Sequence, residues 1–440
     1  MGAQARAIRH EFKVYYLTIK CGAQRQSFSE RCFMGPQAPA VTFQNDRATT
    51  GYLLGRTAAV TRHWLMDRVR RPAEVRSPSD IPTDPHQLST QWLTAALSNG
   101  VAGAQITDFD IPTGDSGTST RFALRVAWNA TGQEAGLPTE LFVKTTNSWQ
   151  QRLILGFTGM VKGEPLFYSR FRNNLAITAP RGYYGAYDER SWRSIAIMED
   201  IASTRGAQFL SPLQPADRNG MENLLADLAT MHGRLWARTE LATCGLRDSF
   251  NLISWSDSLV NLRRRSHVGV ERAAAVVPRE IADRTDDIYD SNFRTLELDR
   301  AMPSTLLHGD GHAAQRFRTA EGREGLSDWQ VVHRGHWAWD VAYTMNSALT
   351  VEDRRSWDRE LVGYYLDRLA REGGPVMTFD DAWNEYRRHC FYPYIAWIFT
   401  IGRAAYHPNW QPDEYSLAII ERTGQAIVDH DSLAVLDSAS

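Results

Sequence analysis

The sequence predicts an α+β protein with two unequal lobes, a small β-rich lobe followed by a larger α-helical lobe. A chain of 440 residues is long enough for two or three folded units of roughly 150 residues each. Hydrophobic residues make up 43% and charged residues 23%, which is typical of a globular protein with a sizeable core. Short alternating apolar runs fill the front of the chain, whereas runs of helical periodicity fill the back.

The N-terminal residues 1–75 form an extension of unknown role in this interpretation. The first 31 residues carry six basic side chains against two acidic ones, without the continuous apolar core of a secretory signal. We expect an unstructured leader, and an organelle transit peptide is the less favoured alternative. The proline-rich segment 70–85 indicates a linker to the folded lobes.

The first lobe, residues 84–200, is predicted to contain mainly strands. Alternation of apolar and polar side chains predicts strands, and apolar side chains three and four positions apart predict helices. In chain order the expected elements are a helix over 87–97, strands over 106–111 and 122–128 separated by a turn of small residues, a strand over 140–144, a helix over 163–173 and a strand over 194–198.

The second lobe, residues 201–440, is predicted to be mainly helical. Leucine and methionine side chains give a helix over 221–236 one apolar face. Further helices are expected over 352–372 and 379–402. The apolar stretch 391–402 is shorter than the roughly 18 residues that span a bilayer, so it indicates a buried helix and no membrane span is expected.

The amino-acid composition limits the classes of binding partner and the cellular compartment that we expect. The 49 basic and 51 acidic residues give a formal net charge of −2, so no general attraction to nucleic acid or anionic lipid is expected. The four cysteines have neither disulfide-framework nor zinc-ligand spacing, which favours a reducing, cytoplasmic location. The oligomeric state stays open.

Three acidic residues of the second lobe lie at positions that are typical of catalytic or ligand-binding side chains. Asp310 and Asp328 each follow a short apolar run, and Asp340 comes shortly after them. Loops at strand ends often carry functional side chains, and phosphoryl transfer needs an Asp facing the attacking hydroxyl and oxygen ligands for Mg²⁺. The H-x-D-x-x-x-x-N spacing of kinase catalytic loops is matched by His308, Asp310 and Gln315.

These motifs together resemble the aminoglycoside phosphotransferase and choline kinase-like superfamily of small-molecule kinases, including its ecdysteroid kinase-like relatives. The catalytic loop of that superfamily reads roughly H-G-D-x-H-x-x-N, and a D-W-Q metal-binding motif follows it. This chain has His308-Gly-Asp310-Gly-His312-Ala-Ala-Gln315 and then Asp328-Trp-Gln. The resemblance covers about residues 84–400 and implies a two-lobed protein-kinase-like fold. It also implies that the first lobe, residues 84–200, binds the nucleotide and that the second lobe, residues 201–440, carries catalysis and substrate binding.

The resemblance implies a role for each motif residue. Asp310 would be the catalytic carboxylate that orients the substrate hydroxyl, and His308 would brace the loop. Asp328 and Gln315 would bind Mg²⁺, while Asp340 would fix the catalytic loop. The superfamily has Asn where this chain has Gln315, and octahedral Mg²⁺ tolerates little displacement of a ligand. A nucleotide-binding pseudokinase with weak or no turnover is therefore an open alternative.

Lys144 ends an apolar strand, where an unpaired ammonium group is costly to bury and needs an anionic partner. The chain contains four lysines, Lys13, Lys20, Lys144 and Lys162. Lys162 beside a helix start is the alternative candidate. By the resemblance, Lys144 would bind the ATP phosphates with Glu164 as its helix partner.

Two further segments complete the ATP site that the resemblance implies. The turn between the first two strands would cover the phosphates with backbone N–H groups and hydroxyls, although it lacks G-x-G-x-x-G. A second segment resembles the connection between the lobes, whose backbone contacts adenine. The residues are Gly114, Ser116, Gly117 and Thr118 in the turn, and Glu199 and Asp200 in the connection.

The sequence thus predicts Mg·ATP-dependent phosphorylation of a small-molecule hydroxyl. By the resemblance, aminoglycosides, choline-like compounds, sugars and steroid-like alcohols are all possible acceptors, and a fold cannot choose among them. A remote alternative is a metallohydrolase in which His308, Asp310 and His312 bind a transition metal.

Overall fold

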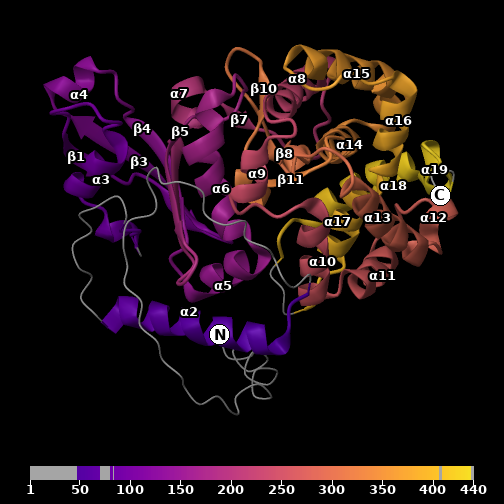
Figure 1. Ribbon diagram of the computed structural model, residues 1–440, viewed down its shortest axis with the longest axis horizontal. Coiled ribbons are helices and arrows are strands. Elements are labelled where there is room, and N and C mark those ends of the chain that lie inside the picture. Colours follow the sequence, from indigo (N-terminus) through magenta and orange to yellow (C-terminus); the bar gives the residue numbers. More distant parts are fainter. Residues whose placement is uncertain (1–46, 70–79, 83, 406–408, 438–440) are drawn as a thin grey trace.

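The computed structural model of the protein describes residues 47–69, 80–82, 84–405 and 409–437. Figure 1 shows an antiparallel sheet toward one end of the molecule and a larger group of helices toward the other. The β-rich part comes first in the chain and the helical part follows. The predicted α+β fold class with a small β-rich and a larger α-helical lobe is confirmed.

The main sheet belongs to the front part of the chain. Its strands pair in the order β1-β3-β4-β6-β5, β2 pairs with β3, and all pairings are antiparallel. Leu124, Leu141 and Val143 alternate inward, as strand geometry requires, and are fully buried. The strands are β1 (Ile106–Asp110), β2 (Gly114–Ser116), β3 (Thr120–Trp128), β4 (Glu140–Thr145), β5 (Gly182–Asp188) and β6 (Arg193–Glu199).

Short helices flank this sheet. The buried side chain of Trp92 joins the apolar core of the sheet, and it comes from the helix predicted over 87–97. The helices are α3 (Thr90–Leu97), α4 (Ala130–Glu134), α5 (Trp149–Thr158) and α6 (Gly163–Leu166). We predicted one helix over 163–173, but regular helix ends with α6 and a π-helical turn follows. The buried Arg172 guanidinium donates to carbonyl oxygens of the next loop, which holds the chain out of the helix.

Helices dominate the rest of the chain, and α8 and α15 match the predicted helices over 221–236 and 352–372. The helices are α7 (Ile201–Arg205), α8 (Arg218–Arg234), α9 (Thr239–Thr243), α10 (Ser249–Val260), α11 (Leu262–Arg272), α12 (Arg279–Ala282), α13 (Thr285–Asp299), α14 (Ala338–Ala348), α15 (Val351–Arg371), α16 (Phe379–Arg388), α17 (Phe391–Ile401), α18 (Asp413–Asp429) and α19 (Ser432–Asp437). All the residues of α14 are buried, so this helix runs through the centre of the helical part.

The motif residues lie in the loops that connect the strands of two small sheets among these helices. These strands were not predicted, because strands of two or three residues give no periodic signal. They are β7 (Gln208–Phe209), β8 (Thr305–Leu307), β9 (Arg316–Arg318), β10 (Glu324–Leu326) and β11 (His333–Gly335). β11 pairs antiparallel with β8, and β10 pairs antiparallel with β9. The chain from β8 to β11 therefore folds back on itself.

The helix predicted over 379–402 is divided into α16 and α17. Pro393 lies in the first turn of α17, where the missing N–H of proline is tolerated. The buried apolar side chains of α17 belong to the main core. Within the described ranges, none of the helices is both long and apolar enough to cross a membrane.

The expectation of an unstructured leader is wrong for residues 50–69, which form the long helix α2 (Thr50–Val69). This helix lies next to α5 at the lower edge of the view in Figure 1. Asp67 at its end accepts a hydrogen bond from the buried Arg152 guanidinium at 2.7 Å. The helix was missed because its sequence mixes polar and apolar residues and its only buried residue is Val60. Residues 1–46 and 70–75 of the predicted extension lie outside the described residues.

Candidate functional site

Lys144 connects the sheet with the helical part of the chain. It lies on β4, and its Nζ donates to Glu164 Oε1 and to Asp328 Oδ1, each at 2.8 Å. Its side chain is 13% exposed, so both contacts are largely shielded from water. Lys162, the alternative candidate, pairs with Glu189 at 2.6 Å. The structure therefore brings together Lys144, Glu164 and Asp328, three of the predicted site residues.

A close approach of two backbones sets the position of α6. A Cβ atom at Gly163 would lie 2.1 Å from the carbonyl oxygen of Gln330, so only glycine fits there. Phe167 stacks on Trp329 with 3.9 Å between the ring centroids. These contacts hold α6 against the loop after β10, and they set the separation of the carboxylates that the two segments carry.

Lys144, Glu164 and Asp328 form a group that we call the Lys144 cluster. Burial and neighbouring charges shift the pKa values of these three residues in opposite directions. Burial acts to lower the pKa of Lys144, but the carboxylates of Asp328 and Glu164 outweigh it and raise the pKa above its ordinary value. Burial raises the pKa of Glu164 to about 6, against the opposing effect of Lys144. Burial also acts to raise the pKa of Asp328, but the Lys144 ammonium outweighs it and lowers the pKa. Two carboxylates around one ammonium favour a further cation nearby.

Asp340 of α14 holds the main chain of the predicted catalytic loop. Its buried carboxylate accepts the N–H of His308 at 2.6 Å and the N–H of Gly309 at 2.9 Å. His232 Nε2 lies 3.2 Å from Asp340 Oδ2, and His232 Nδ1 lies 2.8 Å from the Tyr365 hydroxyl. Burial acts to raise the pKa of Asp340, but these neighbours outweigh it and lower the pKa. This geometry agrees with the expected role of Asp340 in fixing the loop.

His308 ties the catalytic loop to the segment that carries Asp328. Its Nε2–H donates to the carbonyl oxygen of Ser327 at 2.9 Å, and its Nδ1 accepts the N–H of Asp310 at 3.3 Å. Burial lowers the pKa of His308, in agreement with a neutral ring. Because both ring nitrogens are used within the protein, a metallohydrolase site that includes His308 would have to break these bonds.

Asp310 keeps a partly accessible carboxylate, with 27% of its side chain exposed. His312 Nε2 lies 3.4 Å from Asp310 Oδ2 and 3.3 Å from the side-chain nitrogen of Gln315. The main-chain oxygen of Gln315 accepts the N–H of Ser327 at 2.9 Å. This bond places Gln315 and Asp328, the two predicted Mg²⁺ ligands, on neighbouring segments.

The predicted phosphate-covering turn is the exposed hairpin of β2 and β3. Gln151 of α5 donates through its amide to Ser116 Oγ and to the carbonyl oxygen of Gly117, each at 3.1 Å. The N–H of Gly117 donates to the carbonyl oxygen of Ser119 at 2.9 Å. Gly114 begins β2 and Thr118 is exposed at the tip. The contribution of this turn to nucleotide binding stays a prediction.

Glu199 and Asp200 make internal contacts at the end of the sheet. Glu199 accepts the N–H of Arg181 and pairs with Arg205, while Asp200 caps α7. Their own N–H groups donate to the carbonyl oxygens of Arg181 and Glu140. A cavity of about 860 Å³ is lined partly by Glu199, but by none of the Lys144 cluster. Adenine binding at this connection therefore stays a prediction.

Some residues that shape the site were not singled out from the sequence. Ser327 receives the His308 hydrogen bond, Trp329 stacks on α6, and Tyr365 holds His232. The position of Trp329 in the D-W-Q motif was the one available signal. The other contacts join segments far apart in the chain, and local spacing carries no information about them.

No family model and no curated protein matches the chain. Solved structures match it at low identity. A microcompartment-associated aminopropanol kinase is 11% identical, with 74% of this chain and 92% of that chain covered and a TM-score of 0.42. An ethanolamine kinase from Plasmodium vivax is 12% identical, with 85% and 94% covered and a TM-score of 0.42. A macrolide 2′-phosphotransferase from Brachybacterium faecium is 14% identical, with 71% and 93% covered and a TM-score of 0.38.

Proposed function

We propose that this protein is an ATP- and Mg²⁺-dependent phosphotransferase that acts on a hydroxyl group of a small molecule. The observation that carries the proposal is the meeting of Lys144 from the sheet with Asp328 from the helical part at 2.8 Å, completed by Glu164. Asp310 stands on a loop that His308 ties to the same region. Phosphoryl transfer depends mainly on such positioning and on neutralisation of charge.

Each residue has one task in this proposal. Lys144 holds phosphate oxygens of the nucleotide, and Glu164 keeps the ammonium group oriented. Asp310 accepts a hydrogen bond from the substrate hydroxyl, aligns it for attack and is placed to take its proton. His308 and Asp340 act as positioning residues, because their contacts are with the main chain of the loop and its neighbour.

The donor groups beside Asp328 fit Mg²⁺. The carboxylate of Asp328 and the amide oxygen of Gln315 are hard oxygen ligands, which Mg²⁺ prefers over nitrogen or sulfur. Bound Mg²⁺ would supply positive charge that neutralises the phosphate oxygens during transfer. Lys144 pairs with Asp328 and neutralises part of its charge.

We infer that the acceptor is a hydroxyl-bearing small molecule, such as an aminoglycoside, a choline-like compound, a sugar or a steroid-like alcohol. Residues 341–440 contain 15 acidic and nine basic side chains. This negative balance favours a cationic acceptor, because opposite charge steers a ligand toward its site.

A screen of ATP consumption against a library of alcohols and aminoglycosides tests the proposal. We expect at least one compound to be phosphorylated in the presence of Mg²⁺. With that compound, Asp310→Asn should lower turnover by about 100-fold or more, since a positioned base contributes about 10²–10⁴-fold. ATP-dependent thermal stabilisation should persist in Asp310→Asn and should weaken in Lys144→Ala.

Asp287→Asn is the matched control, because Asp287 is 57% exposed on α13 and lies outside the site. This variant should keep the turnover of the unmodified protein. If Asp310→Asn were as active as the control, Asp310 would have no place in the mechanism. Phosphorylation without Mg²⁺ would remove the metal from the proposal.

A further inference from the structure

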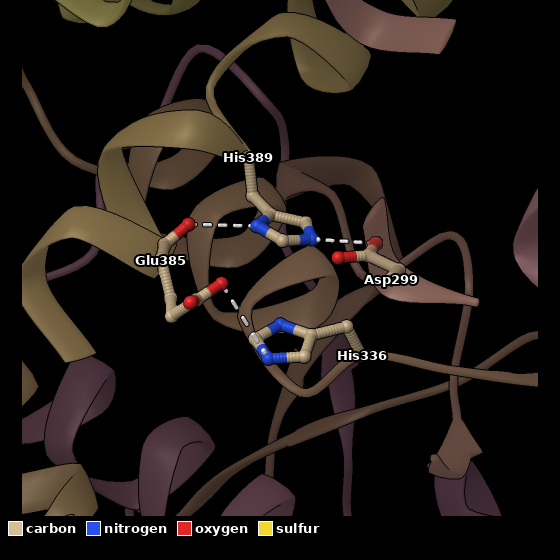
Figure 2. Close-up of side chains that lie close together, drawn as sticks. All are labelled: Asp299, His336, Glu385 and His389. Carbon is tan, nitrogen blue, oxygen red and sulfur yellow. Dashed lines mark hydrogen bonds and ion pairs between the residues drawn. The ribbon is translucent and has the colours of Figure 1, made fainter. Parts of the chain in front are cut away.

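A second group of polar side chains lies inside the helical part, apart from the Lys144 cluster. Asp299 ends α13, His336 lies between β11 and α14, and Glu385 and His389 are one turn apart at the end of α16. Figure 2 shows the four side chains converging from these separate segments. Each offers one possible metal-ligand atom, and all four atoms lie within 4.8 Å of one another.

The distances in this group are close to those of a metal site. His389 Nε2 is 3.0 Å from Asp299 Oδ2, and His336 Nε2 is 3.7 Å from Glu385 Oε2. Ligand bonds of about 2.0–2.2 Å in tetrahedral geometry separate neighbouring ligand atoms by roughly 3.3–3.6 Å. All four atoms lie within 4.8 Å of one another, so an ion at the centre requires the more distant side chains to move inward by about 1 Å.

The carboxylate of Asp299 supplies an independent observation that points to a cation. Its side chain is 6% exposed, and its Oδ1 atom is buried without a hydrogen-bond partner among the described residues. In Figure 2 this free carboxylate oxygen faces the space between the two imidazole rings. A buried carboxylate oxygen without a partner is costly, and a cation at that place would satisfy it.

His389 is oriented as metal-binding histidines are. Its Nδ1–H donates to the carbonyl oxygen of Glu385 at 2.7 Å, which directs Nε2 toward the group. Such a bond from the second ring nitrogen is the usual support of a metal-binding imidazole. The N–H of Ala338 donates to His336 Nδ1 at 3.4 Å, which leaves His336 Nε2 facing Glu385. Arg388 pairs with Glu385 Oε2, the same oxygen that faces His336, so this oxygen would be shared between Arg388 and an ion.

We propose that Asp299, His336, Glu385 and His389 bind one Zn²⁺ ion. Two imidazole nitrogens and two carboxylate oxygens suit zinc, whereas Mg²⁺ and Ca²⁺ prefer oxygen ligands alone. The side chains of the four residues are 2–16% exposed, and four protein ligands leave no open position for a substrate. The site is therefore structural: it joins α13, the loop before α14 and α16, and it does not depend on the proposed kinase activity.

Metal analysis of the full-length protein, purified without chelator, tests this site. We expect about one zinc per chain, a lower melting temperature after chelation and recovery on addition of Zn²⁺. Co²⁺ in place of zinc should give the visible absorption of a tetrahedral nitrogen and oxygen site. His336→Gln and His389→Gln should each lower the zinc affinity at least tenfold.

His267→Gln is the control, because His267 lies 49% exposed on α11 and pairs with Asp286 outside the site. It should keep the full zinc content. A folded wild-type protein that contains no zinc and takes up none in equilibrium dialysis would overturn the proposal. Full zinc retention in both His336→Gln and His389→Gln would also overturn the proposal. The wild-type measurement decides the question even if the variants fail to fold.

Discussion

At the residue scale, Gln315 stands where the proposed kinase would hold its metal ion. Its main chain is held by Ser327, whose N–H and hydroxyl both donate to the Gln315 carbonyl oxygen. Its side-chain amide lies beside His312. The position of the backbone is therefore fixed, and the longer side chain carries its amide oxygen further than asparagine would. Octahedral Mg²⁺ is sensitive to such a displacement.

We expect Gln315→Asn to raise turnover by about threefold to tenfold, which corresponds to about 1 kcal/mol of transition-state stabilisation. Asparagine is the residue that holds Mg²⁺ in the H-x-D-x-x-x-x-N spacing of kinases, so the shorter amide would bring the proposed metal ligand to that length. Steady-state phosphorylation of the acceptor found in the screen measures this effect, with urea unfolding to show equal stability. A lower rate at unchanged stability would contradict the metal role of Gln315. ATP binding without turnover in either form would favour the pseudokinase alternative.

At the scale of elements, α2 is attached to the sheet region by a buried ion pair. The Arg152 side chain is 1% exposed and the Asp67 side chain 9% exposed, and Arg193 also pairs with Asp67. Desolvation lowers the pKa of Arg152 although Asp67 acts to raise it. Removing one member of a buried pair leaves an uncompensated charge, which costs more than the pair itself contributes.

Asp67→Ala should therefore lower the free energy of unfolding by about 3 kcal/mol. Urea denaturation followed by circular dichroism measures it. The matched control is Asp287→Ala, which removes an exposed pair with Arg284 and should cost less than about 1 kcal/mol. Equal losses in the two variants would show that α2 is not held by Asp67.

At the scale of the whole molecule, Asp227 of α8 links the helical part to the segment that precedes β5. It accepts the N–H of Thr178 at 2.7 Å, and Arg323 lies 3.4 Å from its other oxygen. Its side chain is 12% exposed. Burial raises the pKa of Asp227 to about 6, and the hydrogen bond from Thr178 opposes this only in part. The folded state therefore binds the proton more tightly than the unfolded chain does.

A carboxyl group with a raised pKa in the folded state stabilises the fold below its unfolded pKa, and this contribution is lost as pH rises through about 6. Asp227→Asn keeps the shape without the charge. We expect the variant to exceed the wild type in unfolding free energy by up to about 3 kcal/mol at pH 7.5 and to approach it near pH 4.5. Urea unfolding of both proteins at the two pH values measures the difference. A difference that does not change with pH would contradict the raised pKa.

Local patterns in the chain were sufficient for much of the fold. Period-two alternation predicted the strand that became β3, a short apolar run predicted β4, and helical patterns predicted α8 and α15. Lys144 could be singled out because an ammonium group at the end of an apolar strand needs an anionic partner. These inferences succeed because each depends on neighbours within a few positions along the chain.

Contacts between segments far apart in the chain could be identified only in the folded structure. The hydrogen bonds of Asp340 to the catalytic loop, the docking of α2 through Asp67, and the end of α6 at its π-helical turn all depend on partners elsewhere in the chain. The group of Asp299, His336, Glu385 and His389 has no recognisable spacing at all. Periodicity records which face of a segment is buried, but packing alone fixes which segment buries it and which polar groups then meet.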